Sequence, residues 1–440
     1  MTTQIFVASG LRGTALLAAA LDSGCFGESR RRVLLLCDTT AVPEAQTPVG
    51  TAPGFDRLRA RFDEVRSWND TVFPLHPAAW SPRPDDVPLW ERHLRRAWDL
   101  GDEEVELALE SPHTAPSQSL AQIFTGGPVT VYADGLTGYG PTPGKVPPLI
   151  GTRVRQLLHP DLLPGLRPLL LGEFGVPSRP VPTEALRKVF GELADAAPEV
   201  EAAEGCALLL LPGTGTFPDA EEAELRLRMV RGTVALGHTR LVLVPHPRGS
   251  GPVRPALRAE AARLGAELTV PESVPAEVLL DRLRPALVVG CSSTALVTAA
   301  AHHGLPVARA GTGALLERLT PYENPARIPA TIVDALLPDL AGPAGVPDGP
   351  QVTGAAVAEA LDGLLPAVAF AMRPRVRPDL RPAAERYLAA HLNARTWRYF
   401  KRRRLGSLAL PGVVPARLAF VSRSPALRRL ARRARALKRR

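Results

Sequence analysis

Residues 4–37 of the chain read QIFVASGLRGTALLAAALDSGCFGESRRRVLLLC. Residues 4–8 form a short apolar run typical of a buried strand, and residues 9–13 form a turn with two glycines. An alanine-rich helix is expected at residues 14–21 and a second strand at residues 32–37. A strand, a helix and a strand in succession indicate a parallel α/β sheet.

The same alternation continues along most of the chain. Further strands are predicted at residues 105–109 and 129–132, with a helix at residues 116–124 between them. The proline-rich PSRPVP at residues 177–182 is interpreted as an interdomain linker, and a second α/β series follows it. The strands of that series are expected at residues 207–211, 240–244, 267–270, 286–289 and 306–309, with helices at residues 219–232, 255–264 and 294–303. We therefore predict two Rossmann-like domains facing each other across a cleft.

The predicted organisation has four parts. Residues 1–180 and 181–345 are the two Rossmann-like domains, and residues 346–390 are helices that close the fold. Helix patterns span residues 352–370 and 382–399. Residues 391–440 form a basic, helical C-terminal tail.

The charge of the chain is distributed unevenly. Sixteen Lys and Arg residues and no acidic residue lie between His391 and Arg440, so the net charge of +9 leaves −7 for residues 1–390. This asymmetry points to a tail that contacts a membrane surface or a nucleic acid. Trp397, Tyr399 and Phe400 beside the basic residues 401–404 favour the headgroup region of an anionic membrane. A solvated, disordered arginine tail is the alternative interpretation.

The sequence shows no pattern typical of a secreted, membrane-spanning or cysteine-ligated metal protein. The N-terminus lacks a basic n-region and no apolar run approaches the ~20 residues of a spanning helix, so a cytoplasmic protein is expected. The four cysteines have no CxxC spacing, and small buried hydrophobes are expected at Cys25, Cys37, Cys206 and Cys291.

Ligands of open α/β sheets bind beyond the carboxyl ends of the strands, so polar residues directly after a strand are the candidates. Asp134, followed by Gly135, ends the predicted strand at residues 129–132 and could act as a general base. A simple Asp-Gly turn is the alternative. His246 and Pro247 follow the strand at residues 240–244, where the histidine could assist a leaving phosphate, although a loop histidine between prolines is the alternative.

A third candidate follows the strand at residues 286–289. Ser292 and Ser293 open the predicted helix at Thr294–His303, and hydroxyls together with helix N-terminal N–H groups suit a phosphate. Plain N-capping is the alternative. Lesser candidates for binding a donor nucleotide come from other strand ends, or are ordinary loop residues: Gly213, Thr214 and Glu272.

The sequence lacks the motifs of several common enzyme classes. No Asp-x-Asp occurs, so the usual metal clamp of metal-dependent glycosyltransferases is absent. P-loop, GxSxG and HExxH motifs are absent as well.

The order of these motifs resembles the bacterial sialyltransferases, and most closely the alpha-2,8-polysialyltransferase family. That family pairs an acidic D/E-D/E-G motif with an H-P motif and a paired S/T motif on a GT-B fold. The resemblance extends to about residue 380, and VYADGLTGYGPTP, LLLGEFGVP and RIPATIVDALLP look like its actinobacterial members. The chain departs from the pattern at Ala133, where the family allows a first acid. If that first acid is the base in some members, Glu110 or another nearby carboxylate is the candidate base here.

The resemblance implies roles and partners. Asp134 would be the general base, His246 the general acid, and Ser292 and Ser293 the ligands of the donor phosphate, with Pro247 shaping the His-Pro motif. It implies a GT-B enzyme with an acceptor domain at residues 1–180 and a donor domain at residues 181–345. The expected reaction is an inverting, metal-free transfer of sialic acid, or a related acidic sugar, from a CMP-sugar to a glycan acceptor of a cell-surface polysaccharide. No cofactor is expected, and the tail would attach the enzyme to the inner face of the cell membrane.

Two other functions remain open at this point. One is a GT-B transferase or epimerase that uses a UDP-sugar, because strand-end histidines and a serine-rich helix start would serve it equally. The other is a non-enzymatic protein that binds nucleic acid through its arginine-rich tail. The acidic body carries no basic stripe, which makes nucleic acid the weaker candidate partner.

Overall fold

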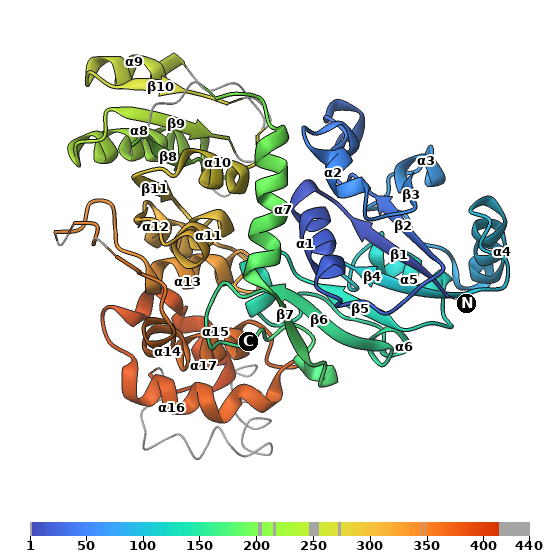
Figure 1. The fold of residues 1–440 in the computed structure, drawn as a ribbon. Coiled ribbons are helices and arrows are strands. Elements are labelled where there is room, and N and C mark those ends of the chain that lie inside the picture. Colours follow the sequence, from blue (N-terminus) through green and yellow to red (C-terminus); the bar gives the residue numbers. More distant parts are fainter. Residues whose placement is uncertain are drawn as a thin grey trace.

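The computed structural model describes residues 2–200, 205–213, 217–245, 255–271, 274–343, 345–347 and 349–412. Within these ranges the chain forms two parallel α/β domains and a helical C-terminal part (Figure 1). The predicted pair of Rossmann-like domains, the GT-B arrangement, is thereby confirmed.

The first domain is built on a seven-stranded sheet of order β3-β2-β1-β4-β5-β6-β7, and all neighbouring strands are parallel. Its strands are β1 (Thr2–Ala8), β2 (Arg31–Leu36), β3 (Glu64–Ser67), β4 (Glu104–Leu109), β5 (Val129–Tyr132), β6 (Val154–Pro160) and β7 (Ser178–Val181). Its helices are α1 (Leu11–Asp22), α2 (Phe55–Arg59), α3 (Trp68–Val72), α4 (Val87–Ala97), α5 (Ser117–Ile123) and α6 (Pro148–Gly151). Short 3₁₀ turns include η4 (Leu136–Tyr139).

In the central strands of this sheet, alternate residues are buried on opposite faces. Phe6 and Ala8 belong to the apolar core that contains α1, whereas Ile5 and Val7 belong to a second core with α4 and α5. Both faces of the sheet are therefore covered. This explains why the strands read as continuous apolar runs rather than as an alternating pattern.

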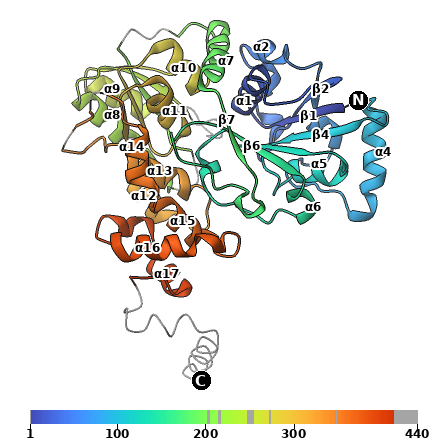
Figure 2. The same ribbon diagram turned by 60° about the horizontal axis from the view of Figure 1, so that its bottom comes forward.

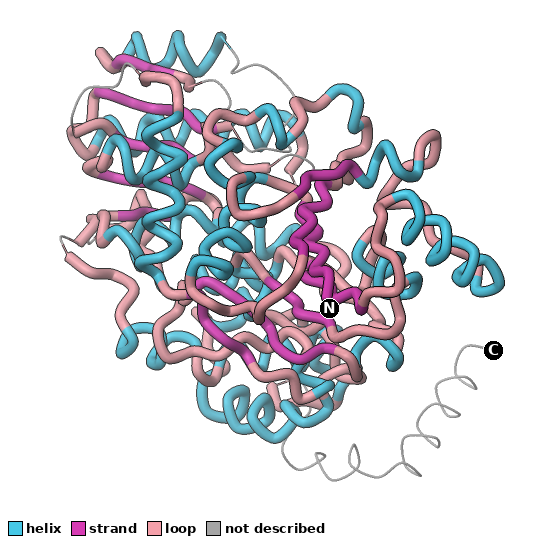
Figure 3. The backbone as a smooth tube through the Cα atoms, turned by 45° about the vertical axis from the view of Figure 1, so that its right-hand side comes forward, coloured by secondary structure: helices cyan, strands magenta, loops and turns pink. Residues whose placement is uncertain are grey.

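The second domain has a five-stranded parallel sheet of order β10-β9-β8-β11-β12. Its strands are β8 (Ala207–Leu210), β9 (Arg240–Val244), β10 (Glu267–Thr269), β11 (Leu287–Gly290) and β12 (Val307–Arg309). Its helices are α8 (Asp219–Ala235), α9 (Pro255–Arg263), α10 (Ala276–Leu283), α11 (Thr294–His303), α12 (Thr312–Arg318) and α13 (Arg327–Leu336). The two sheets stand apart in Figure 3, each in its own half of the molecule.

Helix α7 (Thr183–Ala196) connects the domains and lies between them in Figure 1. It packs against α1 of the first domain and α10 of the second. One continuous apolar core consequently runs from α1 through α7 into the second sheet.

The predicted linker is wrong in detail. Residues 178–181 of the PSRPVP stretch form β7, the edge strand of the first sheet, which pairs with β6. Proline is tolerated there because an edge strand has one side without a ladder partner, so the missing N–H of Pro180 costs little. The chain leaves the first domain only after Val181.

The C-terminal part consists of α14 (Gly354–Leu361), α15 (Leu364–Met372), α16 (Arg381–His391), the turn η7 (Thr396–Tyr399) and α17 (Arg402–Leu408), all next to the second domain (Figure 2). The single helix expected at residues 352–370 is instead two helices that meet at a 47° bend. Gly363 lies at the break, where a Cβ atom would approach Cδ2 of Tyr387 to 2.6 Å. Among the described residues no single helix is long and apolar enough to span a membrane. The bent pair α14 and α15 has sufficient length and apolar composition only when the two helices are taken together.

The first part of the predicted tail belongs to the folded body, which corrects the hypothesis for its aromatic residues. Tyr399 and Phe400 are buried, and the hydroxyl of Tyr399 donates to Asp334 at 2.9 Å. Arg404 forms a 2.7 Å ion pair with Glu323. Tyr399 and Phe400 are therefore unavailable to a headgroup layer, whereas Trp397 is half-buried. Most of the membrane prediction rests on residues 413–440, which lie outside the described ranges.

Candidate active site

Asp134 lies two residues beyond the end of β5, at the carboxyl edge of the first sheet. The backbone N–H of Ala133 still bonds to the carbonyl of Leu158 at 2.9 Å, so the carboxylate follows directly from the sheet ladder. Tyr132 anchors the strand end, because its buried hydroxyl donates to the Val7 carbonyl at 2.7 Å. Burial, and then the nearby carboxylates of Glu110 and Asp134, raise the pKa of this phenol. The half-buried Asp134 is thus held on a rigid support.

Ala133 explains the missing first acid of the family pattern. Its side chain is buried in the core with α4 and α5, and a Cβ atom at Gly138 would come within 2.7 Å of it. A carboxylate at position 133 would therefore lie unpaired among apolar side chains, which is costly. Asp134 is the acid of this motif that borders the interdomain cavity.

The residues after Asp134 contact the second domain. The N–H of Leu136 donates to the hydroxyl of Thr294 at 3.3 Å, and a Cβ atom at Gly135 would approach that same oxygen to 2.8 Å. Glycine is needed at position 135 because any side chain would push the two domains apart. Two of the sequence-predicted motifs, Asp134-Gly135 and the Ser292-Ser293 pair, are therefore brought together across the interface.

Helix α11 begins at this contact point. Ser293 is its N-cap, and its hydroxyl oxygen accepts from the Ala295 N–H at 3.2 Å. The hydroxyl proton of Ser293 remains free to donate, and Ser292 has no hydrogen-bond partner among the described residues. Positive dipole, free N–H groups and two hydroxyls together suit an anionic group. The capping interpretation is correct for Ser293, and it leaves this binding capacity in place.

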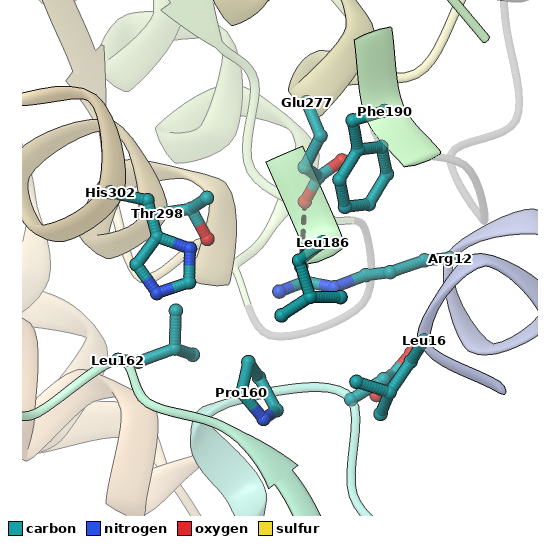
Figure 4. Close-up of a pocket in the computed structure, with 10 residues that line it drawn as sticks. Arg12, Leu16, Pro160, Leu162, Leu186, Phe190, Glu277, Thr298 and His302 are labelled. Atoms are coloured by element: carbon teal, nitrogen blue, oxygen red, sulfur yellow. Dashed lines mark ion pairs between the residues drawn. The ribbon is translucent and has the colours of Figure 1, made fainter. Parts of the chain in front are cut away.

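A small cavity of about 20 Å³ lies between the domains beside Asp134 (Figure 4). This volume has room for little more than one water molecule. Its walls come from both domains and from α7: Arg12, Leu16, Asp134, Pro160, Leu162, Leu186, Phe190, Glu277, Thr298 and His302. Arg12 on α1 and Glu277 on α10 form a 2.8 Å ion pair across the cavity.

His302 on α11 is the one histidine among the described residues that line this cavity. One ring nitrogen, Nε2, contacts the Asp161 carbonyl at 3.1 Å. Burial lowers the pKa of His302, outweighing the neighbouring Asp161 carbonyl and carboxylate, so the ring is neutral at pH 7. Its bond to a backbone carbonyl makes it a link between α11 and the end of β6.

The other predicted site residues are placed less completely. Gly213 lies in the loop that follows β8. Thr214, His246, Pro247 and Glu272 lie outside the described residues, so their roles stay predictions. Glu110, the alternative base, directly follows β4, the neighbour of β5, and accepts a 2.6 Å hydrogen bond from the Ser9 hydroxyl.

Several cavity residues escaped prediction. Arg12 carried a usable signal, because it lies four residues after the end of β1, in the first turn of α1, and polar residues near a strand end border a ligand site. Glu277, Thr298 and His302 lie within helices and carry no such signal. The four cysteines are free and buried, as predicted. In the described part of the chain no group of three or more His, Cys, Asp or Glu side chains could hold a metal ion.

The chain matches one family of known proteins. The family model for alpha-2,8-polysialyltransferase (POLYST) matches residues 4–311. A search of curated proteins found no match.

Solved structures with a similar fold include a sialyltransferase from Photobacterium damselae, at 12% identity and a TM-score of 0.38 over 68% of this chain and 88% of that one. UGT2 of Phytolacca americana, complexed with UDP-2fluoro-glucose and pterostilbene, has 14% identity and a TM-score of 0.40 over 90% and 97%. A putative UDP-N-acetylglucosamine 2-epimerase from Listeria monocytogenes has 11% identity and a TM-score of 0.38 over 84% and 96%. Likenesses this distant carry no argument about substrates.

Proposed function

This chain belongs to the alpha-2,8-polysialyltransferase family, and from that premise we propose that it transfers sialic acid, or a related acidic sugar, from a CMP-sugar to a glycan acceptor. The enzyme is a glycosyltransferase of the sialyl- and polysialyltransferase kind. The proposed product is a cell-surface polysaccharide, and the proposed reaction is inverting and independent of metal. One observation supports it above all: Gly135 and Leu136 contact Thr294, which brings Asp134 to the start of α11.

This arrangement suits a single displacement. Asp134 takes the proton of the acceptor hydroxyl, whose oxygen attacks the anomeric carbon of the donor sugar from the first domain. The bond from that carbon to the CMP phosphate breaks, and inversion follows from attack opposite to the leaving group. The leaving phosphate is stabilised by the N-terminus of α11 and the hydroxyls of Ser292 and Ser293.

His246, in the second domain, is the proposed general acid. It follows β9, a neighbour of β8 in the sheet that also carries β11, and in this role it donates a proton to the departing phosphate. Gly213, Thr214 and Glu272 follow the neighbouring strands and are proposed to contact the nucleotide.

A thermal-shift measurement in buffer with EDTA tests both the donor and metal independence. CMP present at about 100 times its Kd should stabilise the protein by about 2.7 kcal/mol and raise its melting temperature, whereas UDP should not. The gain should shrink in Ser292→Ala, which loses a phosphate ligand, but not in Ser407→Ala, a serine on α17. Protection by UDP alone would favour a UDP-sugar enzyme. Turnover that stops in EDTA and returns with Mg²⁺ or Mn²⁺ would contradict the metal-free reaction.

For residues 413–440 we propose attachment to an anionic membrane surface. This segment has ten basic residues and no acid. Leu427, Leu430, Ala431, Ala434 and Leu437 recur in it at helical spacing. The apolar stripe is narrow, so charge must supply most of the affinity, at about 1 kcal/mol per basic residue near the surface.

A chain that ends at Gly412 should lose binding to vesicles that contain anionic lipid. The cut spares Leu405 and Leu410, which are buried in the core, so the body should keep its melting temperature and its turnover of soluble acceptors. The full chain should co-sediment with anionic vesicles at low salt and not with neutral ones. Equal binding by the shortened chain would place the membrane contact elsewhere, and a preference for nucleic acid over vesicles would overturn the membrane proposal.

A further inference from the structure

Among the described residues that line the interdomain cavity, Arg12 is the one Arg or Lys. Its guanidinium is 26% exposed and pairs at 2.8 Å with the carboxylate of Glu277, which is only 7% exposed. The pair joins two helices of different domains, α1 and α10. Figure 4 shows the carboxylate of Glu277 and the guanidinium of Arg12 joined by a dashed line within the cavity.

Arg12 is fixed relative to the proposed base. The next residue, Gly13, packs so closely on Tyr132 that a Cβ atom would lie 3.0 Å from the phenol oxygen. Tyr132 is two residues before Asp134 and is itself bonded to the end of β1. Arg12 and Asp134 therefore form one rigid side of the site, and Glu277 belongs to the other domain.

The cavity that the described residues form has room for little more than one water molecule, so a sugar ring would need the two domains to move apart before it could occupy this position. Separation leaves Arg12 beside Asp134 and carries Glu277 away with the second domain. A guanidinium without its partner on the acceptor side is a ready site for another carboxylate, which its planar fork can bind in a bidentate manner.

We propose that Arg12 binds the carboxylate of the acceptor's terminal acidic sugar, and that Glu277 occupies this position in the absence of acceptor. The inference rests on the proposed function for the identity of the sugar. The exchange replaces one carboxylate by another, so an acidic acceptor loses little by displacing Glu277. A neutral acceptor cannot replace that charge and is therefore selected against. In this role Glu277 is an internal competitor of the acceptor, and Arg12 is a specificity-determining residue.

The test compares an oligosaccharide that ends in sialic acid with the same oligosaccharide that ends in galactose. In Arg12→Met the KM for the acidic acceptor should rise at least tenfold, with little change in kcat, in the donor KM or in the KM for the neutral acceptor. In Glu277→Gln the acidic acceptor should bind severalfold more tightly, because Arg12 loses its competitor. Arg31→Met is the matched control: Arg31 is 25% exposed, pairs with Glu64 on the same sheet and should leave every constant unchanged.

A purely structural ion pair would behave differently, since both substitutions would lower stability and move KM in the same direction; that result would overturn the inference. A rise in donor KM for Arg12→Met would overturn it too, by placing the guanidinium on the donor. Binding of both oligosaccharides is measured in parallel by thermal shift, without donor. The enzyme could bind the oligosaccharide that ends in sialic acid, lose that binding in Arg12→Met, and yet transfer no sugar. That result would contradict the proposed function and support this inference. Equal affinity of the wild type for both oligosaccharides would contradict the inference alone.

Discussion

Asp134→Asn should lower kcat by a factor of about 10²–10⁴, the range found for removal of a positioned general base. Asparagine has nearly the same shape, so the contact between Gly135 and Thr294 should persist and the KM values should change little. Initial rates with CMP-sialic acid and a sialylated oligosaccharide, measured beside the melting temperature, check this result.

Asp38→Asn is the matched control for this change. Asp38 also follows a strand of the first sheet, β2, but its carboxylate accepts from the Thr40 N–H at 2.8 Å and does not line the interdomain cavity. The control should keep wild-type turnover. If Asp134→Asn also kept it, the base would have to be sought elsewhere, and Glu110→Gln would then be the variant to measure.

His246→Ala should cause a loss of similar size, about 10²–10⁴ in kcat, because the leaving phosphate would depart without a proton. The loss should be much smaller with a nitrophenyl sialoside as donor, since that leaving group needs no protonation. A merely structural histidine would slow both donors equally.

The control for this second prediction is His76→Ala. His76 also precedes a proline, but its Nε2 contacts the Thr40 carbonyl at 2.8 Å, within the first domain. Its replacement should leave kcat for both donors close to the wild-type value. Near-normal turnover of the CMP-sugar by His246→Ala would remove this residue from the mechanism.

Buried strands were predictable from the sequence because burial on both faces of a sheet leaves a continuous apolar run. β5 and β9 begin and end where they were expected, as does α11. Strand β3 and the edge strand β7 were not predictable in this way, since neither carries such a run. At β7 the prolines typical of a linker were compatible with an unpaired strand edge.

Some residues of the candidate site were predictable from the sequence and others were not. Asp134, Ser292 and Ser293 were found because they directly follow strands, and the sheet topology brings such residues to one edge. The sequence could not reveal that Thr294 would contact the loop after Asp134, because that contact depends on how two domains pack. The ion pair of Glu277 with Arg12 could not be predicted either, because the two residues lie on helices that meet only in the tertiary structure.

The predicted membrane contact of Tyr399 and Phe400 was wrong for a related reason. Aromatic and basic residues in alternation suit a membrane interface and also suit a helix that packs on a protein surface. Asp334 and Glu323, far away in sequence, supply the partners of Tyr399 and Arg404 and thereby settle the segment on the second domain.

The chain touches the first domain a second time after it has left the second domain. Arg377, between α15 and α16, donates to the Leu169 carbonyl at 3.0 Å and packs against Gly172, while α7 makes the other connection. Together with the contacts of Leu136 with Thr294 and of His302 with the Asp161 carbonyl, these connections hold the two domains at several points. The C-terminal helices therefore act as a second tether, which opposes sliding of one domain along the other and should return Asp134 to the same place over the first turn of α11 after each catalytic cycle.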